Sequence, residues 1–296
     1  MKNSSYPAAI AALWMVGTLV SFMVMAIAGR ELSEELSTFQ ILFFRSAIGL
    51  LIISYLLHRS GWHQIQSSAL PTHFFRNLAH YGGQYGWFYG LAFIPLAEVF
   101  AIEFTVPVWT AILAALILGE RLTVPRMIAM SMGLTGMLII LRPGLEVIAP
   151  AALAVLAGAF CYAIAYIKTK QLAHIDTPLC ILFYMTVIQL PLGLVPSLFD
   201  WRTPSIEAWP WILVVGVTAL SAHYCITRAM QLVDATVVVP MDFLRLPLIA
   251  VVGFMLYDET MEWAILLGAL VMFVGNYVSI QAEKRKLMSV YGASKD

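Results

Sequence analysis

Residues 97–118 read AEVFAIEFTVPVWTAILAALIL and contain only two charged side chains, Glu98 and Glu103. A helix needs about 20 predominantly apolar residues to cross the hydrocarbon core of a bilayer. The stretch therefore predicts a membrane-spanning helix. Nine further apolar stretches of similar length, separated by short polar breaks, predict the same structure. The ten predicted helices cover residues 6–29, 38–57, 75–94, 97–118, 123–141, 150–170, 179–199, 209–228, 235–256 and 262–282.

The composition supports an all-α integral membrane protein. Of the 296 residues, 61% are hydrophobic and 11% are charged, whereas soluble domains average about 25% charged residues. Ten spans would occupy roughly 200 residues, which leaves no room for a soluble domain of useful size. Lys plus Arg and Asp plus Glu both number 17, so the net charge is zero. The basic surface of a nucleic-acid-binding protein is therefore not expected.

The cysteines and the first apolar stretch do not change this interpretation. Cys161, Cys180 and Cys225 lie inside apolar stretches, where cysteine behaves as a small hydrophobe. They predict neither a disulfide nor a metal site, and we expect no cofactor. Residues 6–29 exceed the apolar region of a signal peptide and are followed by further spans. We interpret them as the first membrane helix.

The basic residues predict the orientation of the chain. With the N-terminus inside, the three predicted outer loops that carry a basic residue hold Arg30, Arg142 and Arg202. The cytoplasmic helix ends and loops hold Lys2, Arg59, Arg76, Arg121, Arg126, Lys168, Lys170, Arg228, Lys284, Arg285, Lys286 and Lys295. Because cytoplasmic loops carry an excess of Lys and Arg, this asymmetry predicts a multi-pass protein of the inner (cytoplasmic) membrane with both termini in the cytoplasm.

The two halves of the chain repeat. One constant offset maps Glu120 onto Glu259, each at the end of a predicted span, and Glu103 onto Asp242 at equivalent depths. We expect two five-helix repeats, residues 6–142 and 148–282, followed by a cytoplasmic tail, residues 283–296. Because five is an odd number, the second repeat enters the membrane inverted relative to the first. Inverted repeats are common in secondary transporters.

Two segments resemble a known family. The first segment runs from Pro107-Val108-Trp109-Thr110-Ala111 to Gly119-Glu120-Arg121-Leu122-Thr123 and on to Arg142-Pro143. The corresponding segment of the second half runs from Pro247-Leu248-Ile249-Ala250 to Asp258-Glu259. Both resemble the EamA module of the drug/metabolite transporter superfamily, in two tandem copies. In the second copy Asp258 replaces the usual glycine, and Arg245 stands where the first copy has Val106. The resemblance implies ten helices around a central cavity and carriage of amino acids, vitamins, nucleotides or drugs, usually as an exporter and sometimes as an importer.

Four ionisable residues lie well inside predicted spans: Arg45, Glu103, Asp242 and Arg245. Such residues cost a few kcal/mol to insert and are functional candidates by default. In the predicted topology, Glu103 and Arg45 lie at similar depths in the membrane and could pair. Asp242 and His223 also lie at similar depths and could meet. The alternative is that Glu103 with Arg45, and Asp242 with Arg245, are internal pairs that only satisfy each other. Our hypothesis is that Glu103, Asp242 and His223 couple transport to protonation or to a change of partner.

The third span predicts part of a binding site. His80, Tyr81, Gln84 and Tyr85 recur with Phe88 at three- and four-residue intervals and form one stripe. Gly82, Gly86 and Gly90 form an adjacent small-residue face that would let another helix approach closely. The candidate binding residues on other spans are Trp14, Arg45, Trp109, Tyr224, Phe243 and Arg245. For each aromatic residue taken singly, a role in the core or in the interfacial belt remains an alternative.

Prolines and terminal carboxylates have structural interpretations. Pro107, Pro240 and Pro247 lie in the spans that carry buried charges, where a proline either loosens the helix or only kinks it. Glu120 and Glu259 stand just before a following helix, where a carboxylate compensates the helix dipole. We expect both glutamates to be structural.

The function predicted is secondary transport of a small organic metabolite by alternating access. Motifs of a Walker nucleotide-binding loop and of known intramembrane hydrolases are absent from the sequence, so an intramembrane enzyme is the weaker alternative, as is a channel. An amino acid, a riboflavin-like vitamin or an adenosylmethionine-like compound would each fit. Proton coupling, exchange and uniport all remain open. The expected partners are this substrate and the lipid bilayer, without nucleic acid or an obligate protein partner.

Overall fold

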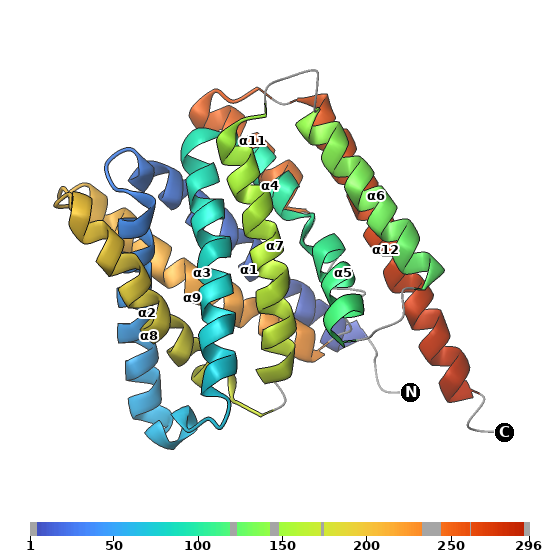
Figure 1. Cartoon of the computed structure of the whole chain (residues 1–296), viewed down its shortest axis with the longest axis horizontal. Coiled ribbons are helices and arrows are strands. Elements are labelled where there is room, and N and C mark those ends of the chain that lie inside the picture. Colours follow the sequence, from blue (N-terminus) through green and yellow to red (C-terminus); the bar gives the residue numbers. More distant parts are fainter. Residues whose placement is uncertain are drawn as a thin grey trace. The chain divides into compact units, whose positions relative to one another are not determined.

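The computed structural model describes residues 5–118, 123–142, 148–172, 175–232, 244–260 and 262–292. Within these ranges every regular element is a helix, as Figure 1 shows. The elements are α1 (Ser5–Ser33), α2 (Thr38–Ser60), η1 (Trp62–Ile65), α3 (Leu70–Phe93), α4 (Leu96–Glu103), α5 (Val106–Leu118), α6 (Val124–Leu141), α7 (Pro150–Leu172), α8 (Pro178–Ser197), η2 (Leu198–Asp200), α9 (Ala208–Leu232), α11 (Arg245–Tyr257) and α12 (Trp263–Gly292).

Short polar motifs determine where several helices begin. Ser37 and Gln40 form a capping box at the start of α2, in which the Ser37 hydroxyl accepts from the Gln40 amide and the Gln40 side chain accepts from the Ser37 amide. The Thr177 hydroxyl accepts from the Cys180 amide at the start of α8. Helix α3 has a proline in its first turn and begins before the predicted start at residue 75, so that it includes His73.

In the part of the chain that the structure describes, six segments are long and apolar enough to cross a membrane: Ile10–Ser33, Thr38–Ser60, Leu96–Ile117, Pro150–Thr169, Pro178–Asp200 and Ala208–Cys225. Three shorter apolar helices are Met127–Leu141, Arg245–Tyr257 and Trp263–Val278. Helix α3, with 24 residues, is not among the six. Its apolar pattern is interrupted by buried polar side chains at His73, Arg76, Asn77, His80 and Gln84.

The predicted continuous helix 97–118 is wrong in one respect, because a turn at Phe104 and Thr105 divides it into α4 and α5. Pro107 explains the break: proline has no amide hydrogen to donate to the carbonyl four residues earlier, and its ring collides with that carbonyl. At the turn the Ile102 carbonyl accepts from both the amide and the hydroxyl of Thr105, at 3.0 and 2.8 Å. Glu103 therefore ends a helix in the middle of a membrane span.

Two pairs of helix starts in the two halves are separated by the offset that maps Glu120 onto Glu259. They are Val106 of α5 with Arg245 of α11, and Val124 of α6 with Trp263 of α12. These helix starts agree with the repeat that the sequence predicts.

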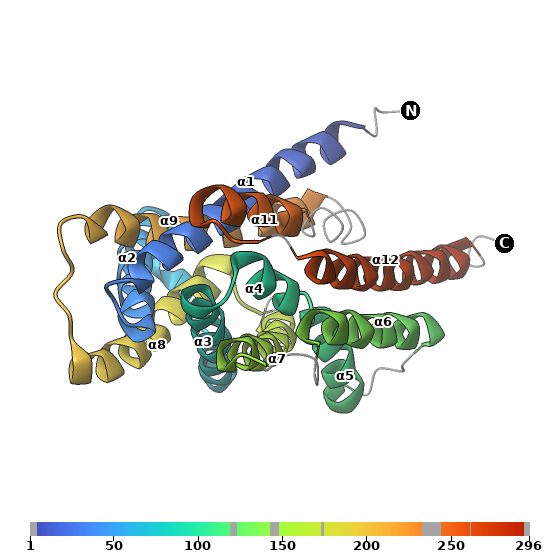
Figure 2. The same cartoon turned by 90° about the horizontal axis from the view of Figure 1, so that it is seen from above.

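The helices form two compact units that do not coincide with the sequence halves. The first unit comprises residues 1–19, 95–148 and 223–296, and the second comprises residues 20–94 and 149–222. Each unit therefore takes helices from both halves of the chain. In the first unit α6 lies beside α12, as Figures 1 and 2 show. There Gly136 and Gly268 let the two backbones meet, because a Cβ on either glycine would lie within 2.6 Å of the other's carbonyl oxygen.

In the second unit α3 lies beside α7 and α2 beside α8. The predicted glycine face of α3 packs on α7: a Cβ on Gly86 would come within 2.2 Å of the Ala154 carbonyl oxygen, and one on Gly82 within 3.3 Å of the Cys161 sulfur. Gly193 of α8 packs equally closely on the backbone of Phe43 in α2. These close approaches hold α3 in a fixed rotation, with its polar face directed away from the glycines.

Candidate functional site

A continuous polar face runs along α3 in the second unit. His73, Arg76, Asn77, His80 and Gln84 all lie on this helix, and all are buried. Their spacing of three or four residues places them on one side of the helix. The sequence predicted His80 and Gln84 as site residues but not the other three. The same spacing, continued toward the start of the helix, is the signal that would have found them.

The centre of this face is a hydrogen-bonded network. His80 Nδ1 lies 3.0 Å from Gln84 Nε2 and 3.0 Å from Gln189 Nε2 of α8. Because an amide nitrogen only donates, Nδ1 accepts and the proton of the neutral ring is on Nε2. Gln189 Nε2 also donates to the Asn77 carbonyl at 3.3 Å. We call His80, Gln84, Gln189 and Asn77 the polar core.

The polar core retains unused hydrogen-bonding capacity. The buried atoms Gln84 Oε1, Gln189 Oε1 and Asn77 Nδ2 form no hydrogen bond with any described residue. Buried polar atoms without a partner are rare and costly in native proteins. Two acceptors and one donor, held by a network, are suited to bind the polar edge of a small molecule.

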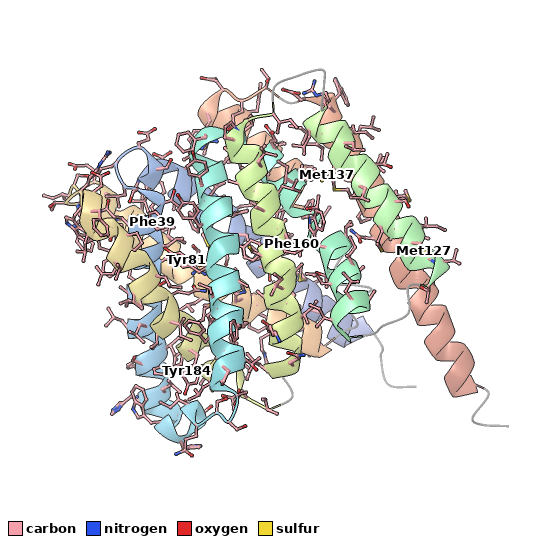
Figure 3. The ribbon with its side chains drawn as sticks, in the orientation of Figure 1. Phe39, Tyr81, Met127, Met137, Phe160 and Tyr184 are labelled. Atoms are coloured by element: carbon pink, nitrogen blue, oxygen red, sulfur yellow. The ribbon has the colours of Figure 1, made fainter. Side chains whose placement is uncertain are left out.

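Aromatic rings lie next to the polar core. The Tyr162 ring of α7 meets His80 edge-on, with 5.5 Å between centroids. Tyr85 contacts Phe39 at 4.7 Å and stacks on Tyr89 at 6.0 Å. Tyr81 is 8% exposed, and its hydroxyl forms no hydrogen bond with a described residue; Figure 3 marks it on α3. The predicted stripe is thus buried except at Tyr85, which is half-buried, and it places flat rings beside hydrogen-bonding groups.

The first unit contains a buried ion pair. Arg245 Nη2 lies 3.7 Å from Glu103 Oε1, and the two side chains are 5% and 18% exposed. The Arg245 guanidinium also stands over the rings of Phe100 and Phe104, at 5.4 and 5.6 Å, which are cation–π distances. Glu103 is the last residue of α4 and Arg245 the first of α11. Glu103 thus lies at the end of one helix and Arg245 at the beginning of another.

The sequence suggested by depth that Glu103 could pair with Arg45 and Asp242 with His223, and by spacing on one helix face that Asp242 could pair with Arg245. The pair of Glu103 with Arg245 was not among these suggestions. Asp242 and Phe243, as well as Glu120, lie outside the described residues.

The remaining aromatic candidates also belong to the first unit. Trp14 and Tyr224 meet edge-on with 5.8 Å between centroids, and Arg228 lies 5.9 Å from the centre of the Trp14 ring. Trp109 Nε1 donates to the Thr105 hydroxyl at 3.2 Å, one turn earlier on the same segment. His223 is half-buried on α9. The structure thus brings Trp14 and Tyr224 together.

Glu259 contacts the beginning of α4. Its Oε2 accepts from the Leu96 amide at 2.8 Å and so caps this helix, a contact that the sequence did not predict. Its side chain also contacts Gly253 closely, where a Cβ would lie 2.3 Å from the carboxylate. A carboxylate at a helix N-terminus stabilises the helix dipole.

One group of side chains in the second unit has metal-ligand chemistry. His73 Nε2 lies 2.8 Å from Asp176 Oδ2, and the thiol of Cys180 lies within 4.8 Å of both ligand atoms. The Ser67 hydroxyl donates to the same Asp176 oxygen at 2.7 Å, and the Tyr184 ring lies 4.5 Å from that of His73. Because His73 and Ser67 both use this oxygen, the group acts as a hydrogen-bonded tie between the starts of α3 and α8.

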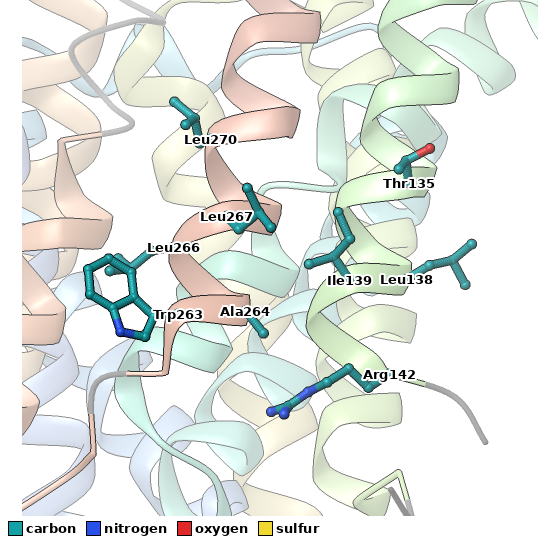
Figure 4. A pocket seen from close by; sticks show the side chains of 9 residues that line it. All are labelled: Thr135, Leu138, Ile139, Arg142, Trp263, Ala264, Leu266, Leu267 and Leu270. Carbon is teal, nitrogen blue, oxygen red and sulfur yellow. The ribbon is translucent and has the colours of Figure 1, made fainter. Parts of the chain in front are cut away.

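An apolar groove of about 870 Å³ lies along α6 and α12 (Figure 4). It is lined by Thr135, Leu138, Ile139, Arg142, Trp263, Ala264, Leu266, Leu267 and Leu270. The lining includes none of the predicted binding residues. Arg142 lies at its end and pairs with Glu262. Exposed leucines of this kind are expected where a helix pair faces lipid.

Comparisons with known proteins agree with these observations. The chain is 24% identical over 276 residues to the S-adenosylmethionine uptake transporter of Rickettsia prowazekii (strain Madrid E), covering 93% of this chain and 94% of the relative. It is 26% identical over 281 residues to the riboflavin transporter of Vibrio cholerae serotype O1 (strain ATCC 39315 / El Tor Inaba N16961), with 93% and 94% covered. A crystal structure of 18% identity shares the fold, with a TM-score of 0.66 over 94% of this chain and 98% of the other.

The chain also matches one transporter family twice in tandem, over residues 9–142 and 149–281. These two matches together cover most of the chain. The chain therefore belongs to the EamA-like transporter family.

Proposed function

We propose that this protein is a secondary carrier that moves a small organic metabolite across the cytoplasmic membrane by alternating access. The family and the names of the relatives point to transporters and not to enzymes. The observation that carries the proposal is the polar core: a neutral histidine held by two amides whose oxygens are buried and unused. Such a group inside an apolar helical bundle is costly, and a polar ligand offsets that cost.

The proposed topology has ten spans in two inverted five-helix repeats, residues 6–142 and 148–282, with a cytoplasmic tail at 283–296. The recurrence of helix bounds at one constant offset supports the repeat. The excess of basic residues at one set of helix ends supports cytoplasmic termini.

The proposed binding residues belong to both units. In the second unit they are Arg45, His80, Tyr81, Gln84 and Tyr85. In the first unit they are Trp14, Trp109, Tyr224, Phe243 and Arg245. The contacts that support them are the His80 network, the ring cluster at Tyr85, and the Trp14–Tyr224 pair.

The proposed coupling residues are Glu103, Asp242 and His223. Glu103 ends α4 and Arg245 begins α11, and at a helix terminus a small change of backbone angle moves a charge. We propose that Glu103 releases Arg245 during transport, on protonation or when substrate takes its place. Uptake that becomes independent of pH in Glu103→Gln, at an unchanged amount of folded protein, would support this role.

The relatives suggest a substrate class. The names of the two relatives give S-adenosylmethionine and riboflavin as transported compounds. Both compounds combine a flat heterocycle with several hydrogen-bonding groups. Rings beside unused amide oxygens, as at Tyr162 and the polar core, are suited to such a molecule.

The proposal is tested by uptake into proteoliposomes of radiolabelled S-adenosylmethionine, riboflavin and a panel of amino acids. We expect saturable uptake of at least one compound. Gln84→Leu, which removes a buried amide, should reduce that uptake at least about tenfold, since losing one hydrogen bond of about 1.5 kcal/mol has this effect. The matched control is Gln171→Leu, at an exposed position near the end of α7, and it should transport normally. Equal loss in both variants, or a chemically altered product inside the vesicles, would contradict the proposal.

A further inference from the structure

The second unit buries two guanidinium groups that meet no carboxylate among its described residues. Arg45 of α2 is 5% exposed and Arg76 of α3 is 6% exposed. Arg76 donates through Nε to the Thr169 hydroxyl at 3.0 Å and through Nη1 to Asn77 Oδ1 at 2.6 Å, and both acceptors are neutral. The Nε of Arg45 is buried and forms no hydrogen bond with a described residue.

The electrostatic surroundings of the two arginines offer no compensation. The titratable groups that act on them within the described part of the unit are two phenols, Tyr162 beside Arg45 and Tyr166 beside Arg76, which are neutral near pH 7. The arginines are also close enough to act on each other, and two positive charges repel. The pair therefore forms a local excess of positive charge inside a helical bundle.

Two carboxylates of this unit are engaged elsewhere. Asp176 accepts from His73 and Ser67 at the starts of α3 and α8. Glu35 accepts from the amide and the hydroxyl of Ser205, in the connections outside the helices. Neither carboxylate is therefore available to the two arginines.

We infer that Arg45, together with the nearby Arg76, binds an anionic group of the transported molecule, either a carboxylate or a phosphate. An uncompensated buried charge is strongly unfavourable, and a ligand that brings the opposite charge removes the penalty. A guanidinium presents parallel donors that match the two oxygens of a carboxylate or phosphate. Asn77 belongs to the polar core and also accepts from Arg76, so the anion site and the core are joined. The inference rests on the proposed function and narrows its substrate to molecules with a negative group.

The test measures thermal unfolding of the purified full-length protein in detergent. The probes are sodium acetate and sodium phosphate, each compared with sodium chloride at equal ionic strength. Wild type, Arg45→Met and Arg59→Met are compared. Arg59 is the matched control, because it lies on the same helix, α2, and is exposed.

We expect acetate or phosphate to raise the unfolding midpoint of wild type and of Arg59→Met, because a ligand that binds only the folded state stabilises it. A response to acetate alone indicates a carboxylate, and a response to phosphate alone indicates a phosphate. The response should disappear in Arg45→Met. In chloride, Arg45→Met should unfold about 2–4 °C above wild type, since the variant no longer buries an uncompensated charge.

The inference would be overturned if acetate and phosphate shifted the unfolding midpoints of wild type and Arg45→Met equally. This holds whatever the midpoints of the two proteins in chloride. If Arg45→Met does not fold, Arg45→Lys replaces it. This variant keeps the charge but loses the planar fork, and it should shrink the response several-fold. The proposed carrier function is tested by a different result: it is contradicted if no solute enters proteoliposomes. A protein that transports only neutral solutes, with no anion response, refutes this inference and leaves the carrier proposal intact.

Discussion

The buried pair of Glu103 and Arg245 offers a quantitative test of the first unit. At 3.7 Å and an effective dielectric constant near 20, two unit charges attract with roughly 4.5 kcal/mol. The separation exceeds that of a charge-assisted hydrogen bond, about 2.8 Å, and the Glu103 side chain is 18% exposed. Both facts weaken the interaction, so we expect a coupling energy of about 1–3 kcal/mol.

A double-mutant cycle measures this coupling. Glu103→Gln removes the carboxylate that faces the buried Arg245 guanidinium and should lower the free energy of unfolding by about 2–3 kcal/mol, somewhat below the range for a fully buried pair. Arg245→Met should lower it less, because Glu103 retains partial access to solvent. The double variant should be more stable than the sum of the two single changes predicts.

The assay is reversible unfolding in mixed detergent micelles, followed by circular dichroism, with Arg142 and Glu262 as a matched control pair. These side chains are 30% and 42% exposed, and exposed pairs contribute about 0–1 kcal/mol. Glu262→Gln should therefore have little effect. If the effects of Glu103→Gln and Arg245→Met add within about 0.5 kcal/mol, the two charges do not interact and the reasoning is refuted.

Three further substitutions test the packing and the caps, each through the free energy of unfolding in the same assay. Gly86→Ala places a Cβ 2.2 Å from a carbonyl oxygen of α7 and should cost about 1–3 kcal/mol, whereas Gly82→Ala, with 3.3 Å to a thiol sulfur, should cost less; equal costs would argue against this packing. Asp176→Asn weakens the buried bond to His73 and should cost about 1.5–3 kcal/mol, and an unchanged stability would show that the tie is not formed. Glu259→Gln removes the negative charge that caps α4 and should cost about 0.3–1 kcal/mol, mostly at low salt; a cost independent of salt would contradict the dipole explanation.

The apolar periodicity of the sequence predicted helices at nearly all the positions where the structure has them, because a membrane span must satisfy its own backbone. The main error was at Phe104 and Thr105, where one predicted helix is two. Pro107 is recognisable in the sequence as a helix-loosening residue, but the choice between a kink and a break depends on local packing. The sequence also did not indicate that each compact unit takes helices from both halves, because hydropathy carries no information on which helices are neighbours.

Because hydropathy does not tell which helices are neighbours, the sequence predicted only part of the candidate site. The three- and four-residue spacing correctly placed His80 and Gln84 on one buried face. The sequence places Arg76 at a cytoplasmic helix end because it lies near the start of its predicted span, whereas the structure buries it. Partners such as Gln189, which contributes an amide to the polar core from α8, depend on tertiary contacts. A single sequence indicates how deep a residue lies along its own helix, but it does not indicate which residue of another helix that residue contacts.

The central claim is that this chain is a carrier, and counterflow tests it most directly. Proteoliposomes are loaded with an unlabelled solute identified by uptake and diluted into a trace of the same labelled solute, without a proton or voltage gradient. A carrier that alternates its access exchanges the two, so labelled solute should rise transiently above its equilibrium level inside the vesicles. A monotonic approach to equilibrium, unaffected by the internal solute, would indicate a channel and would contradict the account.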